Sequence, residues 1–298
     1  MAEPPPSITS APTTGVAVLS SADLACLDEQ QPLNLVCAPF LGTLSGDEYR
    51  ENAASIASYC ATRGAFLIAD PPADWKSVDD VVRDAPLLAP LIAENGAVYW
   101  PPLTDAALSE AVAAVYVRMD ETRGVWKAPA GSEASLGIVT PSMAATEQDT
   151  EVLAPLGVNA IRTFPRYGTV VWGARTMSTN PDYRYIQVRR TILYIEQSIK
   201  NSLQEWTVLQ PNDESTWSAV RTRVNAFLTT LWRDGALAGS RPQEAYRVQC
   251  DASTMSPDDI ANGRLVIVVG MAPLRPAEFI VLRIGMWTAD RPDDDDDD

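Results

Sequence analysis

Three short apolar segments, separated by helical patterns, constrain the fold of the first half of this chain most strongly. Segments 33–38 (LNLVCA), 65–69 (AFLIA) and 97–100 (AVYW) have the length and composition of buried strands. Residues 47–63 and 78–91 between them have apolar residues at helical spacing, and a third helix is expected from Thr104 to about Met119. This alternation predicts an α/β unit with parallel strand pairing.

Local signals set the expected ends of these helices. Gly64 follows the first helix as a C-cap, and Thr104 is expected to cap the third. Pro86 and Pro90 lie inside the second helical pattern. Because proline lacks a backbone donor and clashes with the preceding turn, we expect this helix to be kinked or divided.

The pattern changes from about residue 146. Helices are predicted from Thr146, within 183–200 after a β-like start, over 214–233, and briefly from Ser256 to Gly263; strands are predicted at 159–164, 169–174, 245–250, 264–269 and 278–284. The expected class is mixed α/β (α+β), a β-sheet flanked by helices with extended N- and C-terminal arms. We divide the chain into an arm with a first strand (1–30), an α/β half (31–145), a C-terminal half (146–287) and a disordered acidic tail (288–298).

Charge and hydropathy exclude several classes of function. The formal net charge is −16; Asp290 and Asp293 to Asp298 contribute seven negative charges and Arg291 offsets one, which leaves about −10 for the body. An acidic body is a poor partner for nucleic acid or for an anionic membrane surface. No apolar run is long enough for direct membrane insertion, and the start lacks a signal peptide pattern, so we expect a soluble chain assembled in the cytoplasm.

Enzymatic chemistry finds little support in the residue types. The chain has no histidine, and its four cysteines lack metal-ligand or redox spacing, which predicts reduced, buried thiols. The glycines at 168 and 173 lack the Lys and Ser/Thr of a phosphate loop. We therefore predict no catalytic residues, no cofactor and no metal. A carboxylate pair of the glycosidase type stays open as an alternative.

Several segments closely resemble the motifs of contractile tail sheath proteins, the family found in phage tails and in phage-like injection systems. The resemblance covers about 32–284, and its segments occur in family order. Five arginines lie within this range and are expected to be solvated or to pair with acids across subunits: Arg162, Arg166, Arg175, Arg189 and Arg190. The segments are 66–72 (FLIADPP), 123–129 (RGVWKAP), 159–168 (NAIRTFPRYG), 169–176 (TVVWGART), 185–190 (YIQVRR), 211–214 (PNDE) before Trp217, 227–237 (FLTTLWRDGAL), 268–273 (VVGMAP) and 275–279 (RPAEF).

This resemblance implies a structural function. Members of the family stack as six-subunit rings in a helix around an inner tube, and they contract from a metastable extended state to drive the tube through a target envelope. The implied partners are further copies of the chain, the inner tube protein, baseplate and terminator proteins, and sister sheath proteins. A baseplate or terminator protein, or a minor sheath paralogue, is the alternative. The absence of large outer insertions favours the compact sheaths of extracellular contractile injection systems.

Two sets of contact residues follow from the resemblance. Terminal arms in this family add strands to a neighbour's sheet, for which the candidates are Thr14, Val16, Val18, Phe279, Val281 and Arg283. The short helix before the penultimate strand is the family's usual tube contact, although an ordinary connector would have the same sequence pattern. Its residues here are Ser256, Pro257, Asp258, Asp259, Ile260, Asn262, Gly263 and Arg264.

Overall fold

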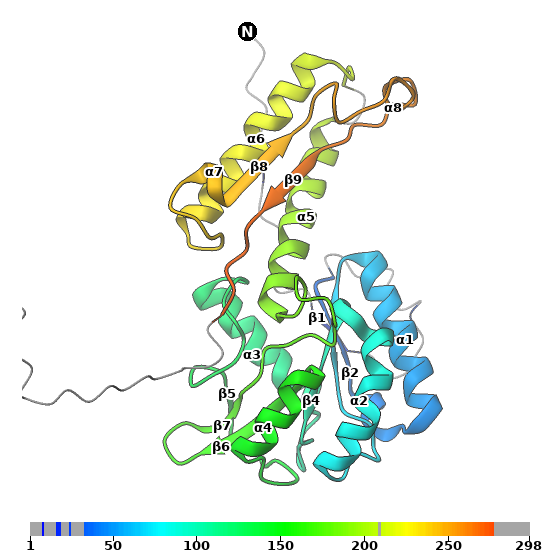
Figure 1. Ribbon diagram of the computed structural model, residues 1–298, viewed down its shortest axis with the longest axis vertical. Helices are drawn as coiled ribbons and strands as arrows, with labels where there is room; N and C mark the ends of the chain where they lie inside the picture. The colour runs from blue at the N-terminus through cyan, green and yellow to red at the C-terminus, as the bar shows by residue number, and fades with distance from the viewer. Residues whose placement is uncertain (1–7, 9–15, 19–23, 25–32, 208–209, 277–298) are drawn as a thin grey trace, which may run out of the picture.

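A seven-stranded sheet organises the first lobe of the protein (Figure 1). The computed structural model describes Ile8, Val16–Val18, Leu24 and residues 33–207 and 210–276. The strand order is β1-β2-β3-β4-β6-β7-β5. The strands are β1 (Val16–Val18), β2 (Leu35–Ala38), β3 (Phe66–Ala69), β4 (Gly96–Trp100), β5 (Ser135–Gly137), β6 (Val158–Phe164) and β7 (Gly168–Val171).

Strands β1, β2, β3, β4 and β6 pair parallel to their neighbours in this order. Strand β7 pairs antiparallel with β6 on one side and with β5 on the other. The predicted parallel α/β arrangement is therefore confirmed. Because β4 pairs directly with β6, the sheet takes strands from both predicted halves of the chain, 31–145 and 146–287. The architecture changes later than residue 145, at the long helix that follows the sheet.

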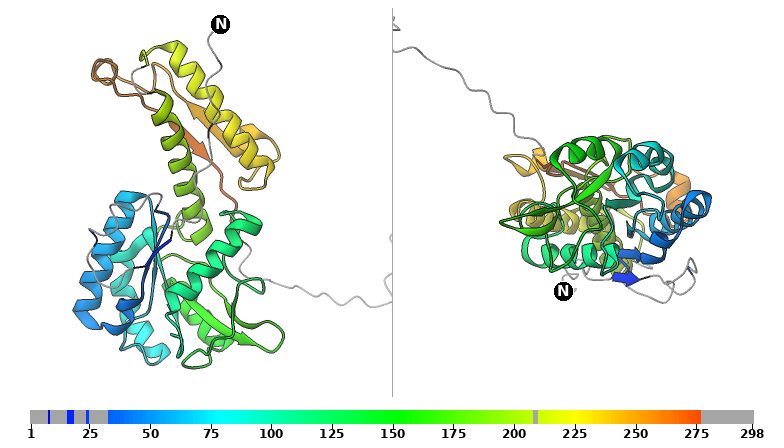
Figure 2. Two further views of the ribbon diagram at one scale, coloured as in Figure 1. Left: turned by 180° about the vertical axis from the view of Figure 1, so that it is seen from behind. Right: turned by 90° about the horizontal axis from the view of Figure 1, so that it is seen from below.

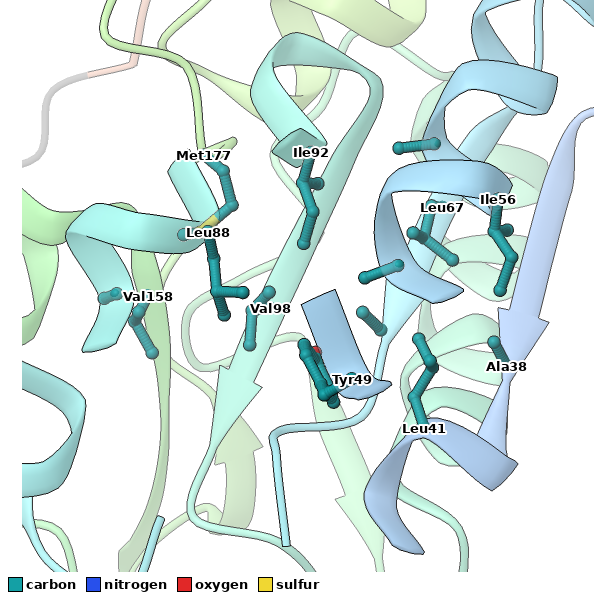
Figure 3. Close-up of a cluster of buried hydrophobic side chains, with 14 of the residues drawn as sticks. Ala38, Leu41, Tyr49, Ile56, Leu67, Leu88, Ile92, Val98, Val158 and Met177 are labelled. Carbon is teal, nitrogen blue, oxygen red and sulfur yellow. The ribbon is translucent and has the colours of Figure 1, made fainter. Parts of the chain in front are cut away.

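Helices cover both faces of this sheet (Figure 2). The helices α1 (Gly46–Arg63), α2 (Val78–Ile92) and α4 (Glu147–Leu153) pack on one face, where Ile56, Leu88 and Val98 belong to a single buried cluster (Figure 3). The helix α3 (Leu108–Arg123) and the first turns of α5 (Ile186–Thr207) cover the other face. Short 3₁₀ turns lie at η2 (Pro39–Thr43), η3 (Ala93–Asn95) and η4 (Ala154–Leu156).

Helix α2 continues through both of its prolines, which excludes a division of this helix. Pro86 and Pro90 are exposed. The carbonyls that lose their helical partner therefore lie on the solvent side, where water can satisfy them. The buried side of the helix, with Val81, Ala85 and Leu88, packs without interruption. Core packing thus outweighs the local cost of proline here.

The predicted start of helix α3 at Thr104 is wrong, because the helix begins at Leu108. The capping group comes from a distant part of the chain: the two carboxylate oxygens of Asp70 accept hydrogen bonds from the backbone N–H of Leu108 (2.9 Å) and of Ser109 (3.1 Å). Asp70 follows β3 directly, and it is 6% exposed. A carboxylate at the positive end of a helix satisfies two of its free donors.

The second lobe contains the end of α5, a long partner helix and a two-stranded sheet. Here α6 (Glu214–Arg233) packs on β8 (Tyr246–Gln249) and β9 (Val268–Met271), which pair antiparallel, while α7 (Pro242–Ala245) and α8 (Pro257–Ala261) are short. Helix α6 has the predicted bounds, and β9 lies later than the predicted 264–269. The segment predicted to start β-like at 183 forms only one bridge, Tyr185 with Arg175, before α5 begins.

The described cysteines are free and buried, as predicted. Burial raises the pKa of the Cys37 and Cys60 thiols to about 12, so they stay protonated and unreactive at neutral pH. Cys26, the predicted strand at 278–284 and the terminal Asp run lie outside the described residues. Within the described part, no helix is long and apolar enough to cross a membrane.

Candidate functional site

The predicted contact helix α8 lies at the far end of the second lobe (Figure 1). Its start is a capping box: the Ser256 hydroxyl accepts from the Asp259 N–H (3.1 Å), and the Asp259 carboxylate accepts from the Ser256 N–H (2.9 Å). The predicted cap is confirmed. Helix α8 has only five residues, so this reciprocal pair stabilises a turn that its own length would not.

Both acids of α8 already have a cationic partner within the chain. Arg264 pairs with Asp258 at 2.6 Å and with Asp259 at 2.7 Å. The Asp258 side chain stays 76% exposed, whereas that of Asp259 is 25% exposed. Two acids and one arginine leave this tip with one net negative charge, and Asp258 is the more exposed of the two acids.

The capping box has a consequence for titration. Hydrogen bonds from Ser256, followed by the one from Arg264, lower the pKa of Asp259 to about 2. A lowered carboxyl pKa means that the cap stabilises α8 above the ordinary pKa and loses this effect as pH falls through about 2. We expect Ser256→Ala to raise the pKa of Asp259 more than Arg264→Gln does, as measured by carboxyl ¹³C NMR titration. Equal pKa values in the two variants would contradict this assignment.

A groove runs between α5 and β9, with a volume of about 780 Å³. Its walls are mainly aliphatic, with Glu196 and Lys200 at the rim. The apolar lining residues are Ile192, Ile195, Ile199 and Leu203 from α5, and Leu265, Ile267, Val269 and Met271 from β9 and the segment before it. An apolar groove that opens along a strand has the shape for an extended peptide.

The groove borders a strand that is paired on one side. Strand β9 pairs with β8, and no other strand pairs with it among the described residues. Because alternate backbone groups of an antiparallel strand point to opposite sides, half of the N–H and C=O groups of β9 are directed away from β8. An additional strand here would gain both backbone hydrogen bonds and apolar contacts.

The structure places the predicted arm residues as follows. Val16 and Val18 lie in β1, opposite Leu35 and Cys37 of β2, so this strand is part of the chain's own sheet, with its outer edge unpaired among the described strands. Thr14, Phe279, Val281 and Arg283 lie outside the described residues. The inter-subunit role of all of them remains a prediction.

A buried polar cluster joins α5 to the sheet lobe, and the sequence did not indicate it. Arg190 of α5 pairs with Asp120 of α3 (Nη1 to Oδ1, 2.9 Å), with side chains 5% and 0% exposed. The guanidinium lies 4.7 Å from the ring centroid of Tyr116, whose hydroxyl bonds to that of Tyr99. Arg190 was expected on the surface or across a subunit boundary; it is instead an internal anchor for the helix that connects the two lobes.

The buried side chain of Asn159 accounts for the glycine at position 173. Its amide donates to the carbonyls of Val98 (3.2 Å) and Arg175 (2.7 Å), and its carbonyl accepts from the Arg175 N–H (2.7 Å). A Cβ at Gly173 would lie 2.7 Å from the Asn159 oxygen, which excludes a side chain there. Asn159 is 1% exposed, and it fixes the chain after β7 against β4 and β6.

We expect Asn159→Ala to lower the free energy of unfolding by about 2–3 kcal/mol, because it leaves the Arg175 N–H and the Val98 carbonyl buried without their partner. Urea denaturation followed by tryptophan fluorescence measures this effect. Thr163→Ala is the control, at an exposed position of the same strand whose hydroxyl bonds to that of Thr169 (3.0 Å). It should cost about 1 kcal/mol or less, because water can replace this exposed hydrogen bond. Similar losses in both variants would contradict the special role of Asn159.

Comparisons with known proteins agree with these motifs. The family model described as the phage tail sheath C-terminal domain matches residues 178–286. The helical sheath of the anti-feeding prophage in its contracted state is 30% identical, with a TM-score of 0.75 and 96% of each chain covered. A chain of the anti-feeding prophage baseplate is 36% identical, with a TM-score of 0.75, covering 91% of this chain and 75% of that chain.

A more distant relative is the tail sheath protein of Salmonella phage ViI, which is 27% identical over 184 residues, or 61% of this chain. This chain matches only 28% of that protein's length. The two anti-feeding prophage structures, by contrast, match 91% and 96% of this chain and therefore both lobes. This chain therefore belongs to the contractile tail sheath family, as a structural component of a phage tail or phage-tail-like particle.

Proposed function

We propose that this chain is the repeating subunit of a contractile sheath, which stacks as six-fold rings around an inner tube and contracts from a metastable extended state. The observation that carries the proposal is the α5–β9 groove beside the edge of β9 with which none of the described strands pairs. A subunit that presents an acceptor for an extended segment can be linked to its neighbours while its core moves as a rigid body.

The proposed occupant of the groove is an arm of a neighbouring copy. Residues 278–284 (EFIVLRI) have the apolar composition of a strand, and the continuous apolar run from Phe279 to Leu282 is typical of a strand that is buried on both faces. The segment that precedes β1, with Thr14, supplies the second candidate, whereas Val16 and Val18 already pair with β2 of their own chain. Exchange of arms would hold successive subunits together in both the extended and the contracted state.

The two lobes suggest how contraction works. The tube-contact helix α8 lies at one end of the molecule, and the sheet lobe lies at the other (Figure 1). Helix α5 spans the distance between them and is anchored by the Arg190–Asp120 pair. The subunit therefore rotates as a unit when α8 leaves the tube, and the small free-energy change of each subunit is summed along the polymer.

Asp258 provides a test of the tube contact. Reversing both acids of α8 would also remove the capping carboxylate of Asp259, so the informative change is Asp258→Lys alone. We expect this variant to keep its melting temperature and to lose about tenfold in affinity for the cognate tube protein, in line with a charge contact worth about 1.4 kcal/mol. Glu51→Lys, an exposed acid on α1, is the matched control. Unchanged binding of Asp258→Lys would remove the tube contact from α8.

The contraction step has its own experiment. Particles assembled from this chain and its tube protein are imaged before and after mild denaturant, with the expectation that the sheath becomes shorter and wider and that the tube protrudes. The similarity to a baseplate chain favours a second candidate, a ring next to the baseplate. In that case the chain would appear at one end of each particle, and the sheath length would not depend on it.

A further inference from the structure

The outward side of α2 is apolar. Val82, Leu87 and Leu91 are 42%, 51% and 36% exposed, and Val152 of the neighbouring α4 is 40% exposed. A helix that faced only water would have polar residues at these positions. Helix α1, on the same face of the sheet, follows that rule: its exposed positions include Asp47, Glu48, Glu51, Ser55, Ser58 and Thr62. The apolar surface of α2 is therefore specific to this helix.

We refer to Val82, Pro86, Leu87, Pro90, Leu91 and Val152 as the α2 face. Its border is acidic. Arg83 on the border is already held by Asp80 (2.9 Å) and Asp84 (2.8 Å). Asp79 and Glu151 are exposed, and neither has an ion pair among the described residues. A partner for the α2 face should thus present apolar side chains together with unpaired cations.

A surface of this kind lies at the edge of the same sheet. Ile138 follows the edge strand β5 and is fully exposed. Because Gly137 lies opposite Thr169, Ile138 sits beside the turn between β6 and β7, which carries Arg166 and Tyr167. Tyr167 is 39% exposed, and the Arg166 guanidinium lies 5.5 Å from its ring centroid. We refer to Ile138, Arg166 and Tyr167 as the hairpin knob.

The knob is basic in an otherwise acidic protein. Arg166 has no carboxylate partner in the described part of the chain, and neither does Arg118, which donates to the carbonyl of Ser135 in β5 (2.7 Å). The α2 face and the knob occupy separate places on the lobe: α2 covers the sheet, and the β6–β7 hairpin extends from its edge (Figure 1). Each subunit therefore carries two complementary surfaces, the α2 face and the hairpin knob, that do not contact each other within the subunit.

We propose that the α2 face of one subunit receives the hairpin knob of another copy in the assembled sheath. This contact rests on the proposed function, since it needs a polymer of this chain. A pairing of either surface with its own copy would place acid against acid or cation against cation. The pairing of one surface with the other is heterologous, and a repeated heterologous contact generates rings or helical filaments. The contact would act in addition to arm exchange at the α5–β9 groove.

The test is a charge swap measured by sedimentation of the chain with its tube protein. Leu87→Arg places a cation opposite Arg166, and Ile138→Glu places an acid opposite Asp79 and Glu151. Each single variant should reduce the sedimenting fraction about tenfold or more, because one like-charge contact in every interface accumulates along the polymer. The double variant carries an attractive pair in every interface and should recover to within about threefold of wild type.

Both positions are exposed, so the melting temperatures of the monomers should match wild type within about 2 °C. Ser55→Arg, on the polar side of α1, is the control and should assemble normally. Normal assembly of either single variant overturns the contact, and loss of assembly without recovery in the double variant shows that something other than the knob occupies the α2 face. A wild-type chain that fails to assemble overturns the proposed function, and this contact with it.

Discussion

Ile199→Glu should abolish polymerisation while leaving the folded monomer intact. Ile199 lies on the wall of the α5–β9 groove and is half-buried, so its side chain can turn a new carboxylate to solvent in the free subunit. In the assembled state a neighbour's segment would cover that carboxylate among the aliphatic side chains of the groove wall. Desolvation of a carboxylate in apolar surroundings costs several kcal/mol, and a net loss of about 3 kcal/mol weakens each contact about a hundredfold.

The measurement is sedimentation of the variant with its tube protein, beside thermal unfolding of the variant alone. Ser218→Glu, an exposed position on α6, adds the same charge outside the groove and should assemble as wild type does. A melting temperature that falls by more than about 5 °C would mean that the groove belongs to the monomer core. Polymers of Ile199→Glu with wild-type length would contradict the groove as the acceptor.

Arg190→Met should lower the free energy of unfolding by about 3–5 kcal/mol, since it leaves the fully buried Asp120 carboxylate without its partner. Arg190 also lies over the Tyr116 ring, so the cation supports two neighbours at once. The loss should appear as a lower midpoint in urea, with a fall in melting temperature of several degrees.

The double variant Arg190→Met with Asp120→Leu separates the ion pair from general packing. Replacing both charges with apolar groups of similar size removes the unpaired carboxylate and should recover most of the lost stability. The coupling free energy from the double-mutant cycle should therefore exceed about 2 kcal/mol. A coupling near zero would contradict the interpretation of Arg190 as the anchor between α5 and the sheet lobe.

The strands and most helices followed from local patterns, because β2, β3 and β4 are short apolar runs buried on both faces. Errors arose where a distant residue decided the local structure. Helix α3 starts late because Asp70, 38 residues earlier, caps it, and α2 passes through Pro86 because its opposite side is packed in the core. A short sequence window around either helix does not contain the residues that determine its structure.

Local sequence likewise predicted some features of the interaction surfaces and missed others. Ser256, Pro257 and Asp259 predicted the capped turn of α8, since capping is a local effect. The burial of Arg190 and the α5–β9 groove each join residues of different elements that lie far apart in the chain. The pairing of Arg264 with Asp259 and Asp258 spans only 5 and 6 residues. The family motifs include several of these positions, but they do not indicate what each residue contacts. Asn159 and Gly173, for example, pack against each other inside the subunit.

Negative-stain electron microscopy of the purified chain, alone and together with its cognate tube protein, tests whether the chain forms a sheath. We expect hollow helical tubes of six-fold character, longer and more regular when the tube protein is present. Monodisperse single subunits in both samples would contradict the sheath function and would favour a baseplate, terminator or minor-paralogue role for this chain.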